Sequence, residues 1–243
     1  MMLRRLLVAF DFDHTIINKN SDLVVRDLIP SEKIPTEVKE LYRSDGWTLY
    51  MQKIFDLLHS NGVTRDQIQS SVKSIPVTPG FDKLLSLLKQ ETSDVIIISD
   101  SNSQFISDWL VDHSLDNTVS QIFTNPAHYD SDGCLKIEMY HTQDWCELSS
   151  KNLCKGYILE SYIKEKAQQG ITFSTVAYVG DGKNDLCPCL RLSANDLAFP
   201  RVGYSLMEAI KDIVNSDKQD SLKAKVYPWN TGSDILQVIS QYV

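Results

Sequence analysis

The 243-residue chain is predicted to fold as an α/β protein built on a doubly wound parallel sheet. Short runs rich in Val, Ile, Leu and Ala are typical of strands that are buried on both faces of such a sheet. Helical patterns lie between these runs, and the polar motifs considered below follow a strand or open a helix. Ligands of doubly wound sheets bind outside the carboxyl ends of the strands. The sequence therefore predicts a functional site at that edge.

The strands and helices can be assigned in chain order from their apolar patterns. Four runs are expected to form the sheet, with the fourth the weakest: Leu6–Phe10, Val95–Ser99, Val176–Gly180 and Asp196–Phe199. Apolar residues recur with helical spacing in Phe81–Gln90 and Gly156–Gln168. After Tyr227 we expect a turn and a final amphipathic helix.

The interval between the first two strands is longer than a simple crossover requires. We interpret residues 21–75 as a small helical cap inserted into a core of residues 1–20 and 76–243. Its helical stretches are Asp22–Leu28, Thr36–Tyr42, Thr48–His59 and Thr64–Ser74. A second interval, Gln121–His141, has turn residues at Asp130–Gly133 between two strand-like runs, which predicts a β-hairpin flap.

The composition limits the classes of partner and compartment. The net charge of −8 argues against a nucleic-acid or anionic-membrane surface. The start MMLRRLLVAF begins like a signal peptide, but Asp11 ends the apolar run too early for one or for a membrane span. The five cysteines suit reduced thiols, and their spacings, C-x7-C and C-x-C, are poor zinc patterns. We expect a cytoplasmic protein that binds neither nucleic acid nor membrane, and its oligomeric state stays open.

Two aspartates, Asp11 and Asp13, follow the first strand. Like charges so close repel each other unless a cation lies between them, although a DxD pair alone also suits a solvated turn. Three further signals stand at strand or helix ends: Ser99 with Asp100 and Asn102, Lys155-Gly156, and the stretch Gly180–Asp185. Asp11 and Asp181 would then hold a hard divalent cation, Mg²⁺, through oxygen ligands. That cation would cancel the repulsion.

These four signals resemble, in order, the motifs of the haloacid dehalogenase-like (HAD-like) phosphohydrolases. DFDHT matches the DxDxT signature, IIIS the second motif, Lys155 the third and GDGKND the acidic fourth. The longer strings DFDHTIINKNSD, IIISDSNS, FTNPA, KNLCKG, YVGDGKNDLCP and FPRVGY resemble the animal phosphoethanolamine/phosphocholine phosphatase family, especially its pyridoxal-phosphate phosphatase branch. The resemblance implies a HAD-like Rossmannoid core and a Mg²⁺-dependent phosphoric monoester hydrolase that acts on a small phosphate ester.

The resemblance also implies in-line phosphoryl transfer through an aspartyl-phosphate. Asp11 would be the nucleophile and a metal ligand, and Asp13 the general acid and base as well as a metal ligand through its backbone carbonyl. Asp181 would complete the protein ligands, with Asp185 in the second shell. Ser99 and Lys155 would bind the transferring phosphoryl group.

Neighbouring residues allow more than one interpretation. Asn184 and the backbone amide of Phe12 could complete the phosphate cradle, together with the amide of Asp13. Thr15 suits either a loop-orienting hydrogen bond or a plain turn, and His14 is interpreted as structural. Lys183 is expected to point to solvent or to add positive charge at the rim.

Two acids bear on the substrate, Asp22 and Asp100. An acid beside a phosphate site suits a substrate that also carries a cation, although Asp22 can serve a helix N-terminus and Asp100 can be a loop residue. In the resembled family the matching positions bind substrate. We expect pyridoxal phosphate on resemblance; phosphoethanolamine and phosphocholine are the alternatives, and thiamine monophosphate is an outsider. Tyr42, Trp47 and Tyr50 suit a cation–π contact or simply a small helical core.

Other classes of function fit the sequence less well than a phosphatase. A phosphomutase would use the same aspartate pair but needs a cap that excludes water. A phospho-acceptor or Mg²⁺-binding module without turnover has no use for the acid/base at Asp13. An inactive scaffold is disfavoured because the expected catalytic side chains are all present. A protein phosphatase would need an open crevice, which the predicted cap restricts.

Overall fold

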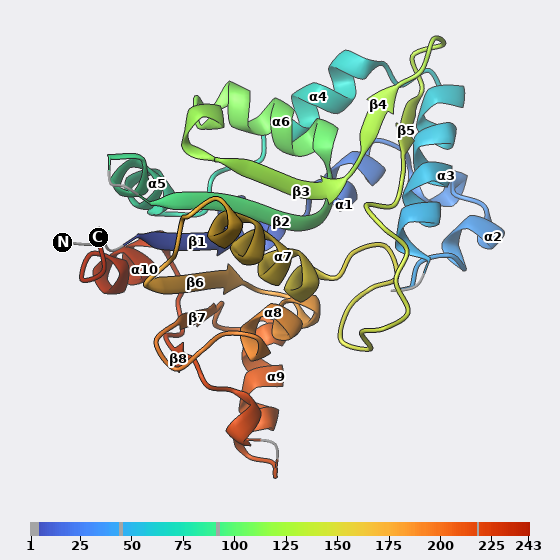
Figure 1. Ribbon diagram of the computed structural model, residues 1–243. Coiled ribbons are helices and arrows are strands. Elements are labelled where there is room, and N and C mark those ends of the chain that lie inside the picture. Colours follow the sequence, from blue (N-terminus) through green and yellow to red (C-terminus); the bar gives the residue numbers. More distant parts are fainter. Residues whose placement is uncertain (1–4, 44–45, 91–92, 218) are drawn as a thin grey trace.

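A parallel sheet of six strands forms the centre of the protein (Figure 1). The structure is a computed structural model that describes residues 5–43, 46–90, 93–217 and 219–243. Residues 1–4, which belong to the predicted core and to the signal-like start, lie outside the described residues. The strand order is β3-β2-β1-β6-β7-β8, and neighbouring strands pair in parallel. The strands are β1 (Leu6–Phe10), β2 (Asp94–Asn102), β3 (Gln121–Asn125), β6 (Thr175–Gly180), β7 (Leu197–Pro200) and β8 (Lys225–Val226).

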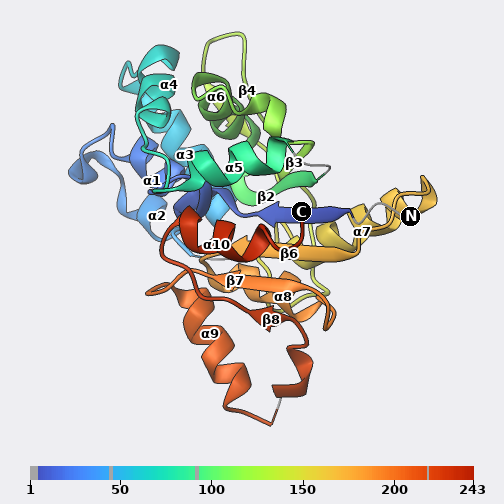
Figure 2. The same cartoon turned by 90° about the vertical axis from the view of Figure 1, so that its left-hand side faces the viewer.

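Helices cover both faces of this sheet, which confirms the doubly wound fold (Figure 2). Alternate residues of β1 point to opposite faces, so Val8 and Phe10 lie in one core and Leu7 and Ala9 in the other. The first core is closed by α5 (Phe81–Gln90), α6 (Ser103–Asp112) and α10 (Gly232–Ile239). The second core is closed by α7 (Lys155–Gln168), α8 (Leu186–Leu190) and α9 (Ser205–Val214).

The segment 21–75 forms helices where the sequence predicts them, with ends that differ by a few residues. They are α1 (Ser21–Arg26), α2 (Thr36–Lys39), α3 (Trp47–Ser60) and α4 (Arg65–Lys73), and residues 44–45 between α2 and α3 lie outside the described residues. Side-chain caps explain two of the starts: Asn20 accepts the Leu23 N–H at 2.9 Å, and Thr64 forms a capping box with Gln67. In Figure 1, α2 and α3 lie beyond the arrowheads of the central strands.

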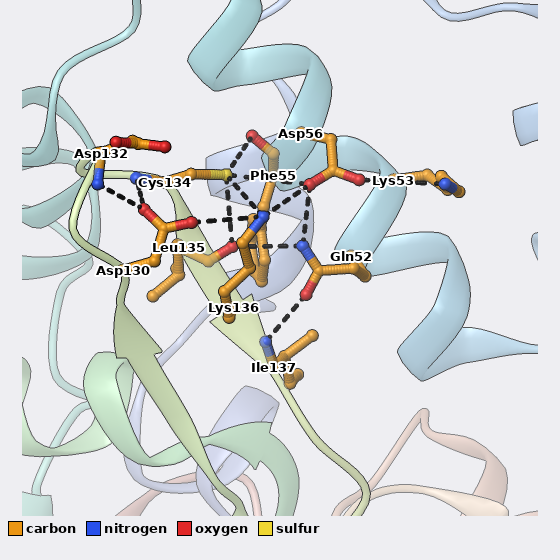
Figure 3. A network of polar contacts seen from close by, with 10 residues as sticks. All are labelled: Gln52, Lys53, Phe55, Asp56, Asp130, Asp132, Cys134, Leu135, Lys136 and Ile137. Carbon is orange, nitrogen blue, oxygen red and sulfur yellow. Dashed lines mark hydrogen bonds and ion pairs between the residues drawn. The ribbon is translucent and has the colours of Figure 1, made fainter.

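The predicted hairpin is present as β4 (Ala127–Tyr129) and β5 (Leu135–Ile137), which pair antiparallel. Asp130 shapes its turn by accepting the backbone N–H groups of Asp132 and Cys134 at 3.0 and 2.9 Å. The hairpin is joined to α3 by the polar network in Figure 3. In this network the Gln52 side chain accepts the Ile137 N–H at 2.9 Å and donates to the Leu135 carbonyl at 3.3 Å.

The structure corrects the sequence prediction at two strands. Gln121–Asn125 belongs to the main sheet as β3 rather than to the excursion, because it pairs in parallel with β2. Strand β2 continues past the predicted end at Ser99 to Asn102, whose side chain then caps α6 by accepting the Phe105 N–H at 3.0 Å. The predicted C-terminal helix is present as α10. None of the helices in the part of the chain that the structure describes is long and apolar enough to cross a membrane.

Candidate active site

The first motif forms a buried turn at the carboxyl end of β1. The Asp11 N–H donates to the Val179 carbonyl at 2.9 Å, which extends the β1–β6 pairing by one residue. The chain then makes a wide turn over Phe12–Ile16, closed by the Ile17 N–H to the Phe12 carbonyl at 3.2 Å. Asp11 is only 4% exposed, and its Oδ1 accepts the Phe12 N–H at 2.7 Å. The turn therefore fixes the carboxylate with Oδ2 turned to other partners.

Arg201 holds this turn from the far side. Its guanidinium donates to the His14 carbonyl and to Asn18 Oδ1, the latter at 2.6 Å. His14 has a φ of 55°, which is rare for a residue with a side chain, and its ring lies 5.4 Å from that of Tyr204. These contacts suit the structural role expected for His14. The sequence analysis missed Arg201, although it lies within the quoted string FPRVGY.

The fourth motif folds back on the end of β6. A Cβ on Gly180 would lie 2.5 Å from Asp185 Cγ, so only glycine leaves room for the Asp185 side chain. Asp185 Oδ2 accepts the N–H groups of Asp181 and Gly182 at 3.0 and 2.9 Å. Its Oδ1 accepts the Tyr178 hydroxyl at 2.6 Å and Lys155 Nζ at 2.7 Å. Both Asp185 oxygens thus have two donors, which is the full acceptor capacity of a carboxylate.

Lys155 is the first residue of α7 and is fully buried. Its Nζ lies 2.8 Å from Asp11 Oδ2 as well as 2.7 Å from Asp185 Oδ1. Burial works to lower the pKa of Lys155, but the nearby carboxylates, Asp11 first, raise the pKa above its ordinary value. A cation at a helix N-terminus is also disfavoured by the helix dipole. The two carboxylates therefore hold the cation in place against both burial and the helix dipole.

The acidic cluster contains more carboxyl groups than Lys155 alone can neutralise. Oxygens of Asp11, Asp181 and Asp185 all lie within 4.8 Å of one another. Burial raises the pKa of Asp11 to about 7, although Lys155 acts to lower it. Burial, and next the repulsion from Asp11, raise the pKa of Asp181 to about 9. Carboxylate oxygens are the ligands that hard divalent ions prefer, so the Asp11 and Asp181 carboxylates suit an ion of that type.

Thr15 and Asp13 lie beside this cluster. The buried Thr15 hydroxyl approaches Asp181 Oδ1 at 3.5 Å, so the first motif touches the fourth. Asp13 Oδ1 accepts the Ser21 N–H at 2.9 Å at the start of α1. Burial, and next the charge of Asp22, raise the pKa of Asp13 well above its ordinary value. The structure thus brings together the predicted residues of the first, third and fourth motifs.

The second motif lies in the neighbouring strand. Phe10 pairs with Ile97, so Ser99 sits beside the turn that follows β1, and its hydroxyl accepts the Ser101 N–H at 3.2 Å. Asn184 Nδ2 donates to Asp100 Oδ2 at 3.0 Å, which links the second motif to the fourth.

One side chain that the sequence analysis missed fixes the backbone at the end of the second motif. It is Asn125 of the quoted string FTNPA, and its Nδ2 donates to the carbonyls of Asp100 and Ser101 at 2.7 and 2.9 Å.

Asp22 lies in the first turn of α1 and is buried. Its Oδ2 accepts Trp47 Nε1 at 2.7 Å, whereas its Oδ1 makes no hydrogen bond of normal geometry among the described residues, although the Asn102 side chain is near enough to act to lower the pKa of Asp22. Burial raises the pKa of Asp22 to about 7, and Asp100 adds to that increase. Trp47 also contacts Tyr42 and Tyr50, with ring centroids 5.2 and 5.7 Å away, so these aromatic residues do form a small cluster.

The parallel sheet, with this acidic site at its carboxyl edge, has the fold of the HAD-like hydrolases. A substrate-bound phosphoserine phosphatase superposes with a TM-score of 0.63 at 18% identity, covering 99% of both chains. A HAD family hydrolase from Salmonella enterica superposes with a TM-score of 0.57 at 17% identity, covering 80% of this chain and 62% of that one. The chain belongs to the family described as "Putative Phosphatase", whose model matches residues 6–243.

Two human proteins illustrate the range of this relationship. The chain is 38% identical over 235 residues to the protein named pyridoxal phosphate phosphatase PHOSPHO2, covering 96% of each chain. It is 34% identical over 233 residues to the protein named phosphoethanolamine/phosphocholine phosphatase, covering 95% of this chain and 86% of that one.

Proposed function

We propose that this phosphatase is a Mg²⁺-dependent phosphomonoesterase that acts on pyridoxal 5′-phosphate through an aspartyl-phosphate intermediate. One observation carries the chemistry: a buried carboxylate, Asp11, lies 2.8 Å from a buried lysine at the carboxyl edge of the sheet. The substrate rests on the 38% identity to the human protein named for pyridoxal phosphate.

In the first half-reaction, Asp11 attacks phosphorus in line with the leaving oxygen and forms the aspartyl-phosphate. Lys155 neutralises charge on the phosphoryl oxygens, and the Ser99 hydroxyl donates a hydrogen bond to one of them. Asp13 protonates the leaving oxygen. Its Oδ1 already accepts the Ser21 N–H, which leaves Oδ2 to carry the proton, and its raised pKa favours the protonated form.

In the second half-reaction, Asp13 takes a proton from water as the water attacks the phosphorus. Inorganic phosphate leaves, and the Asp11 carboxylate is restored. The proton taken from water restores the protonated form of Asp13, so the residue serves as acid and then as base within one turnover.

Asp11, Asp181 and the backbone carbonyl of Asp13 would hold Mg²⁺. When bound, the ion supplies positive charge to the phosphoryl group and orients it for attack. Asp185 would not bind the ion directly, since its oxygens are already engaged by four donors. It orients Lys155 and fixes the backbone at Asp181.

We further propose that residues 21–75 form a substrate-reading cap over a core of residues 1–20 and 76–243. Asp22 would contact the substrate, because its buried Oδ1 makes no hydrogen bond of normal geometry among the described residues and the Trp47 N–H holds the other oxygen. Asp100 lies close enough for its charge to raise the pKa of Asp22. Two acids suit the pyridinium or amine end of a substrate.

The same acids support a second candidate, phosphoethanolamine or phosphocholine. An ammonium group a few bonds from phosphate would sit between Asp22 and Asp100, and one relative is named for these substrates. Pyridoxal phosphate stays first because the identity to its named phosphatases is higher. A phospho-acceptor module without turnover is disfavoured because it has no use for a protonated Asp13.

The test is phosphate release from pyridoxal phosphate, phosphoethanolamine, phosphocholine and a sugar phosphate, with and without Mg²⁺. Intact protein is compared with Asp11→Asn and with Asp130→Asn, a matched change on the hairpin. We expect Mg²⁺-dependent release that is greatest with pyridoxal phosphate, lost in Asp11→Asn and retained in Asp130→Asn. Release by Asp11→Asn at the intact rate would refute the nucleophile, and a higher rate with the aminoalkyl phosphates would reverse the substrate order.

A further inference from the structure

Three cysteines from separate segments converge beside the active-site loops. Cys146 lies in the long connection between β5 and α7, Cys154 directly precedes α7, and Cys187 lies in α8. Their sulfur atoms all lie within 4.8 Å of one another. We propose that Cys146, Cys154 and Cys187 form a binding site for a thiophilic divalent metal ion of the Zn²⁺ type, separate from the acidic site.

The sulfur spacing matches metal coordination. Four ligands at the usual zinc–sulfur distance of about 2.3 Å place tetrahedral sulfur atoms about 3.8 Å apart. Cys187 Sγ lies 3.4 Å from Cys146 Sγ and 3.8 Å from Cys154 Sγ. Small shifts therefore suffice to place one ion within bonding distance of all three sulfurs. The Ser149 hydroxyl, 3.4 Å from Cys146 Sγ, marks a fourth position for itself or for water.

The chain around the sulfurs is shaped to bring them together. A Cβ on Gly156 would lie 2.6 Å from Cys187 Sγ and from Arg191 Nε, so α7 admits this sulfur only because it has glycine there. The Gln143 side chain accepts the Cys146 N–H at 2.9 Å and donates to the Cys146 carbonyl at 3.1 Å. These bonds fix the backbone of Cys146.

The loop that carries Cys146 has little other regular structure. Residues 138–154 contain no helix and, apart from one isolated bridge between Ser150 and Leu153, no strand pairing among the described residues. Loops of this length in compact domains commonly serve a function. A metal ion would tie the loop to α7 and α8 at once.

Charge and access also suit a cation. Binding releases a proton from each thiol, and three thiolates around a divalent ion leave one negative charge. The Arg191 guanidinium, which is also ion-paired with Glu160, interacts with Cys187 and offsets part of that charge. Cys146 is only partly buried, and with Ser149 it lines a cavity of about 410 Å³ that also reaches Lys183 and Asn184. An ion can therefore enter from the side of the loop.

The test starts from reduced protein incubated with Zn²⁺, passed through a desalting column and measured for metal. Asp181→Asn serves as the background, because it weakens the acidic site without touching the sulfurs. We expect one equivalent of zinc per chain in Asp181→Asn. The control combines Asp181→Asn with Cys134→Ser, a change at a buried cysteine outside the cluster, and should retain the same amount. Adding Cys146→Ser and Cys187→Ser should abolish retention. Equal zinc with and without these two cysteines would overturn the proposal.

Cobalt provides a readout that oxygen ligands cannot imitate. Co²⁺ added to the reduced intact protein should give a thiolate-to-metal charge-transfer band, and that band should vanish in Cys146→Ser with Cys187→Ser. If that variant does not fold, alkylation of the intact protein decides instead: Zn²⁺ should slow labelling of Cys146 at least tenfold and leave Cys134 unchanged. Absence of both the band and the protection, or a disulfide within the cluster in place of bound metal, would refute the site.

Discussion

Two lysines in this protein each pair with two aspartates, and the two trios have opposite surroundings. At the carboxyl edge of the sheet, Lys155 lies 2.8 and 2.7 Å from the carboxylates of Asp11 and Asp185 and is fully buried. Such a trio is costly to desolvate, and it becomes strongly destabilising when one member is removed.

On the hairpin, Lys136 lies 3.2 Å from Asp56 of α3 and 3.5 Å from Asp130 (Figure 3). These three side chains are 37%, 41% and 29% exposed, so water and salt screen their charges. The same three charges are therefore screened on the hairpin and hardly screened at the proposed active site. Burial, rather than composition, decides how strongly the three charges interact.

The largest expected effect comes from removing the buried lysine. Lys155→Met leaves Asp11 and Asp185 buried without their counter-charge, and we expect a loss of about 3–5 kcal/mol in the free energy of unfolding without Mg²⁺. Turnover should fall by at least about 10²-fold. Urea unfolding and phosphate release measure the two effects. A loss below about 1 kcal/mol would show that this trio is screened like the exposed one.

The stability gained from Mg²⁺ should depend on the buried acidic site and not on the exposed trio. Binding to the acidic cluster should stabilise the folded protein by about 2.7 kcal/mol at one hundred times the dissociation constant, as measured by urea unfolding. Asp181→Asn should lose most of this gain, whereas Asp130→Asn should keep it. If Asp181→Asn keeps the full gain, the ion binds elsewhere.

A pH series tests the burial of Asp22. Its pKa is raised from 3.8 to about 7, so the folded state binds the proton more tightly than the unfolded state. The free energy of unfolding should therefore fall as pH rises through this window. Asp22→Asn cannot ionise at this position, so its free energy of unfolding should not show this fall. The variant should therefore gain stability relative to the intact protein between about pH 5 and about pH 8. A difference that does not vary with pH would contradict the assignment.

The smallest effect is expected for the exposed lysine. Lys136→Met should lower the free energy of unfolding by less than about 1 kcal/mol and leave phosphate release unchanged. Raising the salt concentration should shrink even this difference. A loss equal to that of Lys155→Met would remove the distinction between the two trios.

The sequence analysis succeeded where the signal is local. Apolar runs identified β1 and β6, helical spacing identified α5 and α7, and turn residues identified the hairpin. It failed where a strand depends on distant partners. Strand β3 is short and partly polar, and only its pairing with β2 makes it part of the sheet.

The same distinction holds within the site. The acidic residues could be predicted because they directly follow apolar runs. The sequence analysis missed the roles of Arg201, Tyr178 and Asn125, because these roles depend on partners that the local pattern does not reveal. Arg201, for example, donates to the carbonyl of His14, which lies 187 residues earlier in the sequence. Side chains that orient other side chains leave no periodic signal, and only the folded structure shows them.

The central place of β1 has a consequence for synthesis on the ribosome. This strand emerges before the other strands of the sheet, yet its neighbours are β2 and β6, and β6 ends only at Gly180. At about 5–20 residues per second, one edge of β1 waits on the order of ten seconds or more for its partner. During that interval an apolar strand is available to other chains and to chaperones. Because Lys155 and Asp181 also arrive late, the nascent protein can complete its acidic site only after most of the chain has emerged.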